Sequence, residues 1–346
     1  MPVMSQVSLQ FGIEIELLLG GRKKAHSSWK SLANDLSKRL AAVGINNHVN
    51  DGGDKAIEHY REYSIVREVT IPNQLGKGLW GIELVSPVYP ATWHWAADME
   101  LIFSTIRRYF TMVPSPHCST HIHVSGTPFP LSSIELSALA KAALYFETAL
   151  DQLVPADRRA SNAYWCQSNR SSVALRSLSL KECLVAVEAA WDLPATSSNS
   201  DPDDRSLTRA VVGSMNLFPA SSTYGRTHGK KHDFVRGKVY KWDFSRMLPK
   251  PSSSSKGNAT GATPGTVEFR QPPGSCSAED AKGWITLVLA FVAGATRTTT
   301  SWAPLNAVEG QGGTIGELWA LVVTGASILG WDGVDDAAII FSTRNV

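Results

Sequence analysis

The chain has 346 residues, of which 43% are apolar and 18% are charged, so it is long enough to bury a large hydrophobic core. Its 33 basic and 31 acidic residues leave a formal net charge of +2, which is too small for non-specific attraction to nucleic acid or to an anionic membrane surface. We therefore expect no nucleic-acid partner and no membrane partner, and an acidic ligand must be bound by local groups. We predict a single domain over residues 1–346, with flexible insertions around 195–205 and 250–265.

Compartment and redox state follow from three further features. Residues 1–21 contain no basic segment ahead of an apolar run, which does not fit a secretory signal, and we expect a cytoplasmic protein. The apolar stretch at 284–296 is shorter than the ~20 residues that a membrane-spanning helix needs, so it predicts a buried core helix. Four cysteines without a CxxC pair or a regular close spacing predict reduced thiols.

Hydrophobic periodicity predicts most elements of the N-terminal half. Residues 6–19 alternate and then become continuously apolar, which predicts a strand closed by Gly20 and Gly21. Ser27 or Ser28 is a suitable N-cap for an amphipathic helix that extends to about 43. Further strands are predicted at 63–71, 81–85 and 119–125, and further helices at 93–110 and 132–153.

The C-terminal half alternates structured segments with polar tracts. Helices are predicted at 179–191, 278–297 and 314–325, strands at 237–244 and 266–271, and loops at 196–204 and 250–265. Helices that occur in groups, without a strict βαβ rhythm, indicate an α+β fold with an antiparallel sheet covered by helices on one face. The other face is then available for a site.

The segment 11–17, FGIEIEL, contains the sharpest local feature. Glu14 and Glu16 are two residues apart on a predicted strand, so both carboxylates point to one face of an otherwise apolar segment. Two adjacent buried anions repel, and a cation or protons must compensate their charge; oxygen ligands favour magnesium or manganese over zinc. The alternative is a polar strand face that simply meets solvent.

Two other predicted strands carry charged residues among apolar neighbours. Glu83 lies in GIELVSP, and Glu268 and Arg270 share one strand face in TVEFRQ. An internal ion pair would explain the second case without a function. A functional interpretation is that the arginine fork suits phosphate oxygens, while the carboxylate suits a metal bound to them.

His121 and His123 form a third pair on one strand face, in CSTHIHVS. By themselves they suggest zinc or another transition metal, although a buried histidine can be structural. Within a carboxylate-rich site, one ring could bind a metal or substrate while the other orients it. Cys118 is three residues from His121 and points to the opposite face of the strand, which argues against a Cys/His nucleophile.

These motifs resemble those of the amidoligase family, which is grouped with glutamine synthetase and glutamate–cysteine ligase. The chain contains in the family's order FGIEIEL, GIELVSP, CSTHIHVS and TVEFRQ. The resemblance extends from about 11 to 271, with weaker agreement at 62–64 and 159–166. The order of the four motifs is specific, whereas each motif alone is not.

The resemblance implies a curved antiparallel sheet like that of the glutamine synthetase catalytic domain, in one amidoligase-like catalytic domain. It implies an ATP-dependent carboxylate–amine ligase that forms an amide through an acyl phosphate, with ATP and Mg²⁺ or Mn²⁺ as cofactors. Its substrates would be small-molecule or peptide carboxylates and amines. Two residues depart from the pattern, because Glu62 stands where aspartate is more usual and Asp243 where asparagine is expected.

The same resemblance implies roles for individual residues. The metal ligands would be Glu14, Glu16, Glu83, His123 and Glu268. Catalysis would rest on Glu14, Glu83 and Arg270, with Arg270 as a phosphate clamp. Substrate contacts would come from His121, Ser64, Asn162 and Tyr240.

A basic segment at 224–238 precedes one of the predicted site strands. Its Lys230, Lys231 and Arg236 could bind ATP or an acidic substrate, or the segment could be a solvated loop. Two other functions remain open: a zinc-dependent hydrolase that uses His121 and His123, and a catalytically inactive ligand-binding homologue. The sequence selects neither the acid, nor the amine, nor an oligomeric state.

Overall fold

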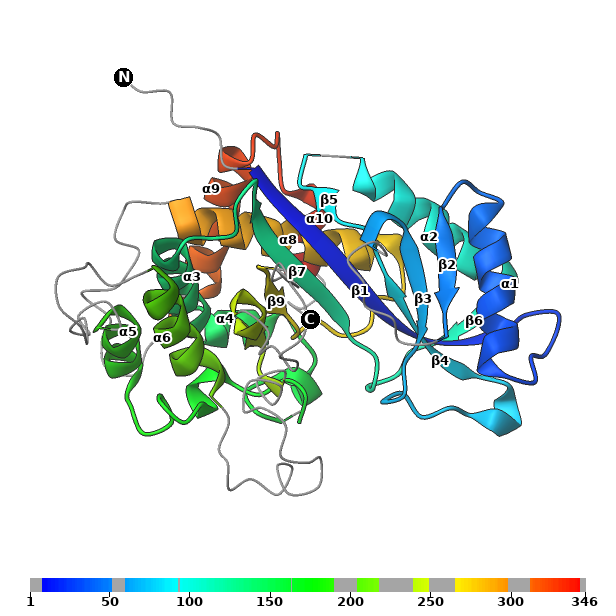
Figure 1. Cartoon of the computed structure of the whole chain (residues 1–346), viewed down its shortest axis with the longest axis horizontal. Coiled ribbons are helices and arrows are strands. Elements are labelled where there is room, and N and C mark those ends of the chain that lie inside the picture. The colour runs from blue at the N-terminus through cyan, green and yellow to red at the C-terminus, as the bar shows by residue number, and fades with distance from the viewer. Residues whose placement is uncertain are drawn as a thin grey trace, which may run out of the picture. The chain divides into compact units, whose positions relative to one another are not determined.

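A computed structural model describes residues 8–51, 60–92, 94–162, 164–189, 204–217, 239–248, 265–297 and 312–342 (Figure 1). The fold is mixed α+β, and its sheet pairings are mostly antiparallel. The expected fold class is confirmed at this level. Among the described residues, no helix combines the length and apolar character needed to cross a bilayer.

The chain divides into two compact units. The strand unit comprises Leu9–His123, Gln271–Leu289 and Val334–Val346. The helical unit comprises Met1–Ser8, Val124–Arg270 and Ala290–Gly333. Each unit draws on separated parts of the sequence, and the expectation of one catalytic domain stays a prediction.

The strand unit contains a sheet in the order β2-β3-β4-β1-β7, with β5 and β6 also paired to β1. These strands are β1 (Ser8–Gly21), β2 (Asn47–Asn50), β3 (Tyr63–Arg67), β4 (Trp80–Val85), β5 (Tyr89–Pro90), β6 (Phe110–Val113) and β7 (Thr120–Thr127), of which the residues from Val124 on are assigned to the helical unit. The β2–β3 pair is parallel, whereas β3–β4 and β1–β4 are antiparallel. The long central strand β1 therefore has partners on both sides.

Alternation along β1 separates an apolar face from a polar one. Phe11, Ile13 and Ile15 are buried, while Gly12 and Glu14 between them are half-buried. The Phe11 ring makes an edge contact with Trp95 of α2 (Trp95–Tyr109), with ring centroids 5.6 Å apart. The helix thus covers the apolar face of the strand, and the glutamates lie on the opposite face.

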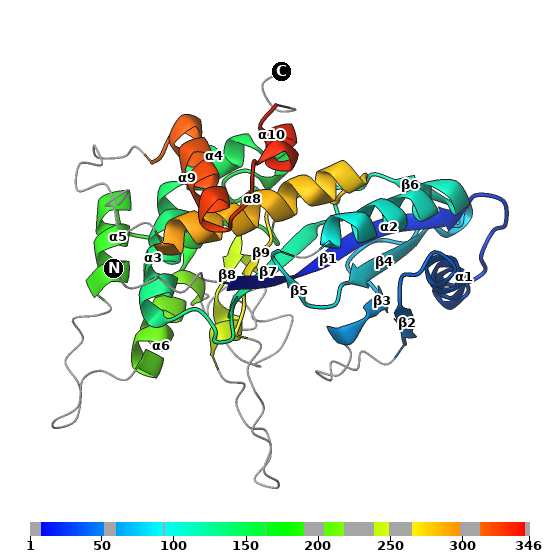
Figure 2. The same ribbon diagram turned by 90° about the horizontal axis from the view of Figure 1, so that it is seen from above.

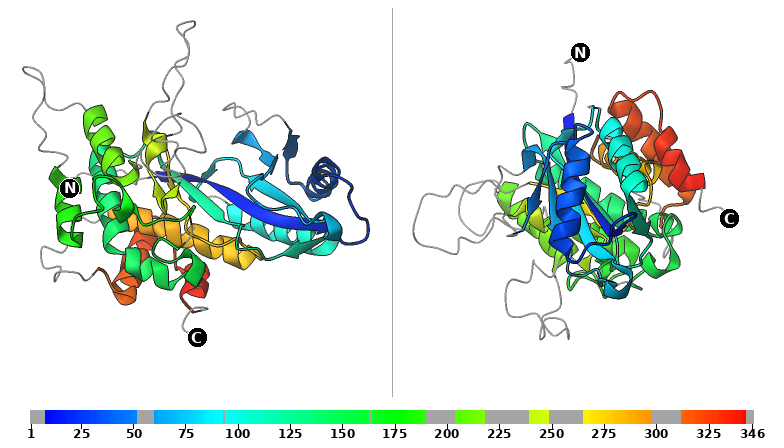
Figure 3. Two further views of the ribbon diagram at one scale, coloured as in Figure 1. Left: turned by 90° about the horizontal axis from the view of Figure 1, so that it is seen from below. Right: turned by 90° about the vertical axis from the view of Figure 1, so that its right-hand side faces the viewer.

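Helix α1 (Trp29–Ala41) also packs in the strand unit, against β2, β3 and β4 (Figures 2 and 3). Ser28 caps it as predicted, because its side chain accepts a hydrogen bond from the backbone N–H of Ser31. The apolar stripe expected from the sequence, which includes Leu32, Leu36 and Leu40, is fully buried.

The helical unit is built around α3, α5 and α6, which contact one another (Figure 2). Its elements are α3 (Ser133–Tyr145), α4 (Glu147–Gln152), α5 (Leu180–Ala189), α6 (Asp204–Asn216), β8 (Trp242–Asp243), β9 (Val267–Phe269) and α9 (Ile315–Ile328). Helix α8 (Ala278–Arg297) spans the division between the units, and α10 (Asp335–Ser342) belongs to the strand unit. Residues 284–296 of α8 are almost entirely buried, as the core-helix prediction requires.

Some predicted bounds were wrong. The helix predicted at 132–153 is broken at Phe146, which leaves helical geometry where its buried ring packs edge-on against Phe291. The strand predicted at 63–71 ends at Arg67, and of the described part, 239–244, of the strand predicted at 237–244, β8 contains Trp242 and Asp243. The predicted insertions at 195–205 and 250–265 fall almost wholly outside the described residues.

Candidate metal centre and active site

Glu14 and Glu16 lie on the polar face of β1, as their spacing predicts. Glu16 is 6% exposed and Glu14 is half-buried. The backbone N–H of Ser119 donates to Oε2 of Glu16 at 2.7 Å, and Glu16 N–H donates to Ser119 O at 3.0 Å. This reciprocal contact holds the Glu16 carboxylate at a defined place on the sheet.

Strand pairing brings a third carboxylate to the same face. In the β1–β4 register, Glu16 is directly opposite Glu83, and Glu14 is opposite Val85. Residues opposite each other on antiparallel strands point to the same side, and like charges at such positions repel. The sequence predicted both carboxylates as site residues, and the register explains how residues 67 positions apart become neighbours.

The two histidines of β7 face Glu14 and Glu16. Nδ1 of His121 is 3.3 Å from Oε2 of Glu14, and its Nε2 is 3.9 Å from Oε1 of Glu16. Nε2 of His123 is 3.1 Å from Oε1 of Glu14. Both rings are buried. The predicted pairing of imidazoles with carboxylates on one face is therefore present within the strand unit.

The donor atoms in this unit fit a divalent cation. Glu16, Glu83 and His121 each offer one ligand atom, and these atoms lie within 4.8 Å of one another. Two carboxylates and an imidazole suit Mg²⁺, Mn²⁺ or Zn²⁺, which take oxygen or mixed oxygen and nitrogen ligands. This group includes His121, whereas the family resemblance implied His123 as the ligand.

Ser64 and His48 lie beside these residues in the sheet. Ser64 pairs with Val85, the partner of Glu14, and so points to the same face as Glu14. His48 pairs with Ser64 in the parallel β2–β3 ladder, and its Nδ1 is 2.8 Å from Oε1 of Glu62. Sequence reasoning missed His48, because a single histidine in a short, half-buried strand carries no motif.

Glu268 and Arg270 lie in the helical unit. Glu268 is fully buried on β9 and forms an ion pair with Arg270, while Nε of Arg246 is 3.8 Å from its Oε2. Asp243 of β8 is directly opposite Glu268, and its Oδ1 accepts a hydrogen bond from Ser245 N–H at 2.8 Å. The ion pair between Glu268 and Arg270 is the alternative without a function that was named for TVEFRQ, and the roles of both residues towards metal and phosphate stay predictions.

The remaining predicted substrate contacts are also in the helical unit. Asn162 is exposed and donates from Nδ2 to Ala156 O at 2.8 Å. Tyr240 is fully buried, and its hydroxyl donates to Leu217 O at 3.3 Å. Burial raises the pKa of Tyr240, so its hydroxyl stays protonated. The predicted nucleotide contacts Lys230, Lys231 and Arg236, together with the segment 224–238, lie outside the described residues.

The cysteines do not point to nucleophilic chemistry. Cys118 is buried in an apolar cluster with Leu18, Ile71 and Leu79. Burial raises the pKa of Cys166 to about 11, so this thiol is protonated at neutral pH. The apolar surroundings of Cys118 agree with the interpretation that Cys118 is not paired with His121 for catalysis.

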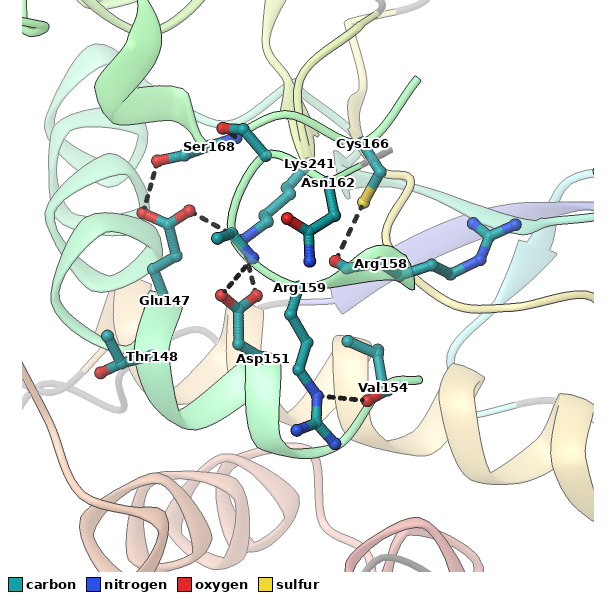
Figure 4. A network of polar contacts seen from close by, with 12 residues as sticks. Glu147, Thr148, Asp151, Val154, Arg158, Arg159, Asn162, Cys166, Ser168 and Lys241 are labelled. Atoms are coloured by element: carbon teal, nitrogen blue, oxygen red, sulfur yellow. Dashed lines mark hydrogen bonds and ion pairs between the residues drawn. The ribbon is translucent and has the colours of Figure 1, made fainter. Parts of the chain in front are cut away.

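The main feature that sequence reasoning missed is a buried lysine. Lys241 is 1% exposed, and its Nζ lies 2.8 Å from Oε1 of Glu147 and 2.6 Å from Oδ1 of Asp151 (Figure 4). Glu147 and Asp151 are four residues apart, which places them on one face of α4. That spacing was visible in the sequence, but nothing there linked it to a lysine 90 residues further along.

An α+β protein with carboxylates and imidazoles on one sheet face belongs to a class suited to metal-dependent chemistry. A family model described as "Putative amidoligase enzyme" matches residues 8–201, which is more than half of the chain. The chain therefore belongs to this amidoligase family, and the resemblance inferred from the motifs is confirmed. No curated protein matches the chain.

Proposed function

We propose that this protein is an ATP- and Mg²⁺-dependent ligase that joins a carboxylate to an amine through an acyl phosphate. Membership of the amidoligase family supports a ligase that forms amide bonds. The observation that carries the metal dependence is the group Glu16, Glu83 and His121, whose ligand atoms lie within 4.8 Å of one another on one sheet face. A cytoplasmic location and a glutamine synthetase-like catalytic sheet are parts of the same proposal.

The chemistry explains why such a site is needed. A carboxylate is a poor acyl donor, because its leaving group would be an oxide. In the proposed reaction the substrate carboxylate oxygen attacks the terminal phosphorus of ATP, which releases ADP and forms an acyl phosphate. The amine then attacks the acyl carbon, the bond to the phosphate oxygen breaks, the amine loses a proton, and inorganic phosphate leaves.

The proposal gives each of the site residues a role in binding metal or phosphate. Glu14, Glu16, Glu83 and His121 would hold Mg²⁺ or Mn²⁺, which neutralises charge on the nucleotide phosphates when bound. His123, 3.1 Å from Glu14, would orient that carboxylate. Glu268 and Arg270 would contribute a further ligand and a guanidinium clamp for phosphate. The Ser119 N–H bond to Glu16 fixes the carboxylate before any ligand binds.

Calorimetry with a non-hydrolysable ATP analogue tests the proposal. The analogue is titrated with and without Mg²⁺ into wild type, Glu16→Gln and Glu100→Gln. Glu100 is an exposed glutamate of α2 in the same unit, so its variant is the matched control. We expect Mg²⁺-dependent binding in wild type and Glu100→Gln, and binding at least about tenfold weaker in Glu16→Gln. Absence of binding under every metal condition would refute the ATP assignment.

The two imidazoles favour a second candidate function, that of a zinc-dependent hydrolase. Its supporting observation is that His121 belongs to the donor group with Glu16 and Glu83, and mixed nitrogen and oxygen sites also suit zinc. Such an enzyme would need Zn²⁺ and no nucleotide. Hydrolysis of amide or ester substrates by the Zn²⁺-loaded protein without ATP, lost in His121→Asn, would favour it over the ligase.

A further inference from the structure

The outer edge of β8, the edge that does not pair with β9, is bound by two asparagines of the helical unit. Asn169 is the first residue of a short 3₁₀-helix, Asn169–Ser171, and Asn216 is the last residue of α6. Asn169 is 3% exposed and Asn216 is fully buried. Buried carboxamides are stable only when their donors and acceptors are bound, so the partners of these two groups show what the groups do.

Both carboxamides bind the backbone of β8 through a donor and an acceptor. Oδ1 of Asn169 accepts from Trp242 N–H at 3.1 Å, and its Nδ2 donates to Trp242 O at 2.8 Å. Nδ2 of Asn216 donates to the same carbonyl at 2.9 Å, and its Oδ1 accepts from Phe244 N–H at 2.9 Å. The two side chains thus bind backbone groups that a neighbouring strand would otherwise bind.

Asn169 also ties β8 to the end of α6. Its Nδ2 donates a further hydrogen bond to Met215 O at 3.1 Å, so one side chain connects the 3₁₀-helix, α6 and β8. The residue that precedes β8 is held by the backbone of the same segment, because Lys241 N–H donates to Gln167 O at 2.9 Å. The position of β8 is therefore determined by two separate parts of the helical unit.

The strand held in this way pairs with β9, which carries a predicted site residue (Figure 2). Asp243 of β8 is directly opposite Glu268 of β9, and Arg270 N–H donates to Lys241 O at 2.8 Å. Strands as short as β8 and β9 are marginal by themselves, so their position depends on what binds their edges. A displacement of β8 would therefore displace Glu268 and Arg270.

The hydrogen-bond pattern at both asparagines requires a carboxamide. Each side chain must donate to Trp242 O and accept from a backbone N–H at the same time. An ionised aspartate could only accept, and it would place a buried charge against that carbonyl. An alanine would leave buried backbone groups of β8 without these partners.

We infer that Asn169 and Asn216 are positioning residues, which place Glu268 and Arg270 by fixing the outer edge of β8. Both act through the β8–β9 pair, and neither is itself assigned a contact with metal or substrate. The inference rests on the proposed function, in which Glu268 contributes a metal ligand and Arg270 binds phosphate.

Hydrogen exchange followed by mass spectrometry tests the placement without nucleotide or metal. In Asn169→Ala and Asn216→Ala, the amides of β9 and Arg270 should exchange about tenfold faster than the loss of global stability, measured by urea unfolding, accounts for. Cys183→Ala is the matched control, since Cys183 is fully buried in α5, which packs against α3 and α6. Exchange in β9 that follows global stability alike in all three variants would overturn the inference.

Calorimetry with the non-hydrolysable ATP analogue and Mg²⁺ measures the consequence for the proposed site. At a temperature where each variant is folded, Asn169→Ala and Asn216→Ala should bind about tenfold more weakly than wild type, because small displacements of binding groups are costly. Cys183→Ala should bind like wild type. Asn216→Ser is the milder variant, and it carries both tests where an alanine variant does not fold.

A double-variant cycle shows whether the carboxamides act through Arg270. Arg270→Lys keeps the charge but loses the paired N–H donors for phosphate, and it should weaken nucleotide binding about tenfold. Asn216→Ala/Arg270→Lys should bind about as weakly as Arg270→Lys, because the effects of residues that act through one another do not add. Additive losses would overturn the inference, as would weakened binding in Asn216→Ala while Arg270→Lys binds like wild type.

The two measurements separate this inference from the proposed function. Absence of nucleotide binding in wild type, together with faster exchange in β9 of the asparagine variants, would remove the ligase and leave Asn169 and Asn216 as the residues that place Glu268 and Arg270. Mg²⁺-dependent nucleotide binding that is unchanged in both asparagine variants would remove the positioning role and leave the ligase.

Discussion

The two acidic clusters of this protein differ in what accompanies the carboxylates. In the helical unit, Glu147 and Asp151 are bound to the ammonium group of Lys241. In the strand unit, Glu14 and Glu16 lie beside the imidazoles of His121 and His123. An ammonium group remains a cation and cannot be a metal ligand, whereas a neutral imidazole can coordinate a metal. The first cluster is therefore built around a permanent internal cation, and the second can accept an external one.

The comparison predicts that the two clusters respond in opposite ways when one charge is removed. Loss of Lys241 would remove the buried cation that compensates the charge of two carboxylates. Loss of one glutamate in the strand unit would instead relieve the repulsion between neighbouring carboxylates. The predictions below test this contrast, and they are ordered from the largest expected effect to the smallest.

Lys241→Met should lower the free energy of unfolding by about 3–5 kcal/mol, because breaking a buried ion pair leaves uncompensated charge. Urea unfolding followed by circular dichroism measures this. Lys141→Met is the control: Lys141 pairs at 3.1 Å with Glu188, whose side chain is 68% exposed, and such a pair contributes about 0–1 kcal/mol. The triple variant Glu147→Gln/Asp151→Asn/Lys241→Met should regain much of the loss. A cost below 1 kcal/mol for Lys241→Met would contradict the role of the lysine.

The contribution of Lys241 should also disappear at alkaline pH. Burial disfavours its charged form, but Glu147 and Asp151 outweigh burial and raise its pKa above the usual 10.5. A raised pKa in the folded state means that the stabilisation is complete below pH 10.5 and is lost as the pH rises through the folded-state pKa. The difference in unfolding free energy between wild type and Lys241→Met should be constant at neutral pH and then fall by about 1.4 kcal/mol per pH unit. Lys141→Met should show no such fall.

Glu83→Gln should have the smallest effect and the opposite sign. Without divalent metal, removal of one of two facing charges, Glu16 and Glu83, should raise the free energy of unfolding by about 0.2–1 kcal/mol. Added Mn²⁺ should stabilise wild type more than the variant, since the variant lacks a ligand. Unfolding in EDTA measures the effect of the lost charge, and unfolding in Mn²⁺ measures the stabilisation by the metal. Destabilisation in EDTA would show that the carboxylate is structural.

Local sequence was a good guide wherever one short segment determines the answer. Ser28 caps α1 because its side chain and the helix N–H groups are neighbours in sequence. Glu14 and Glu16 share a face because strand geometry repeats every two residues. The prediction of one continuous helix over 132–153 was wrong. The break at Phe146 accompanies packing against Phe291, which is distant in the chain and therefore invisible to local sequence.

The candidate sites show the same contrast between features that local sequence predicts and features that depend on distant contacts. Alternation and motif order identified Glu14, Glu16, Glu83, His121 and His123, and the family match confirms the resemblance that those motifs carry. Pairing register then decided that Glu83 faces Glu16 and that Ser64 lies on the same side as Glu14. The position of a strand relative to its neighbour depends on contacts along both strands, so a single motif cannot determine it.

By itself the sequence determined the α+β class, the family, and the faces of β1 and β7 that carry the carboxylates and imidazoles, because these depend on periodicity within short segments. Only the tertiary structure decided that Lys241 is buried between Glu147 and Asp151, and that Asn169 and Asn216 bind the outer edge of β8. A buried charge is stable only beside its partner, and the partner is chosen by how distant segments pack.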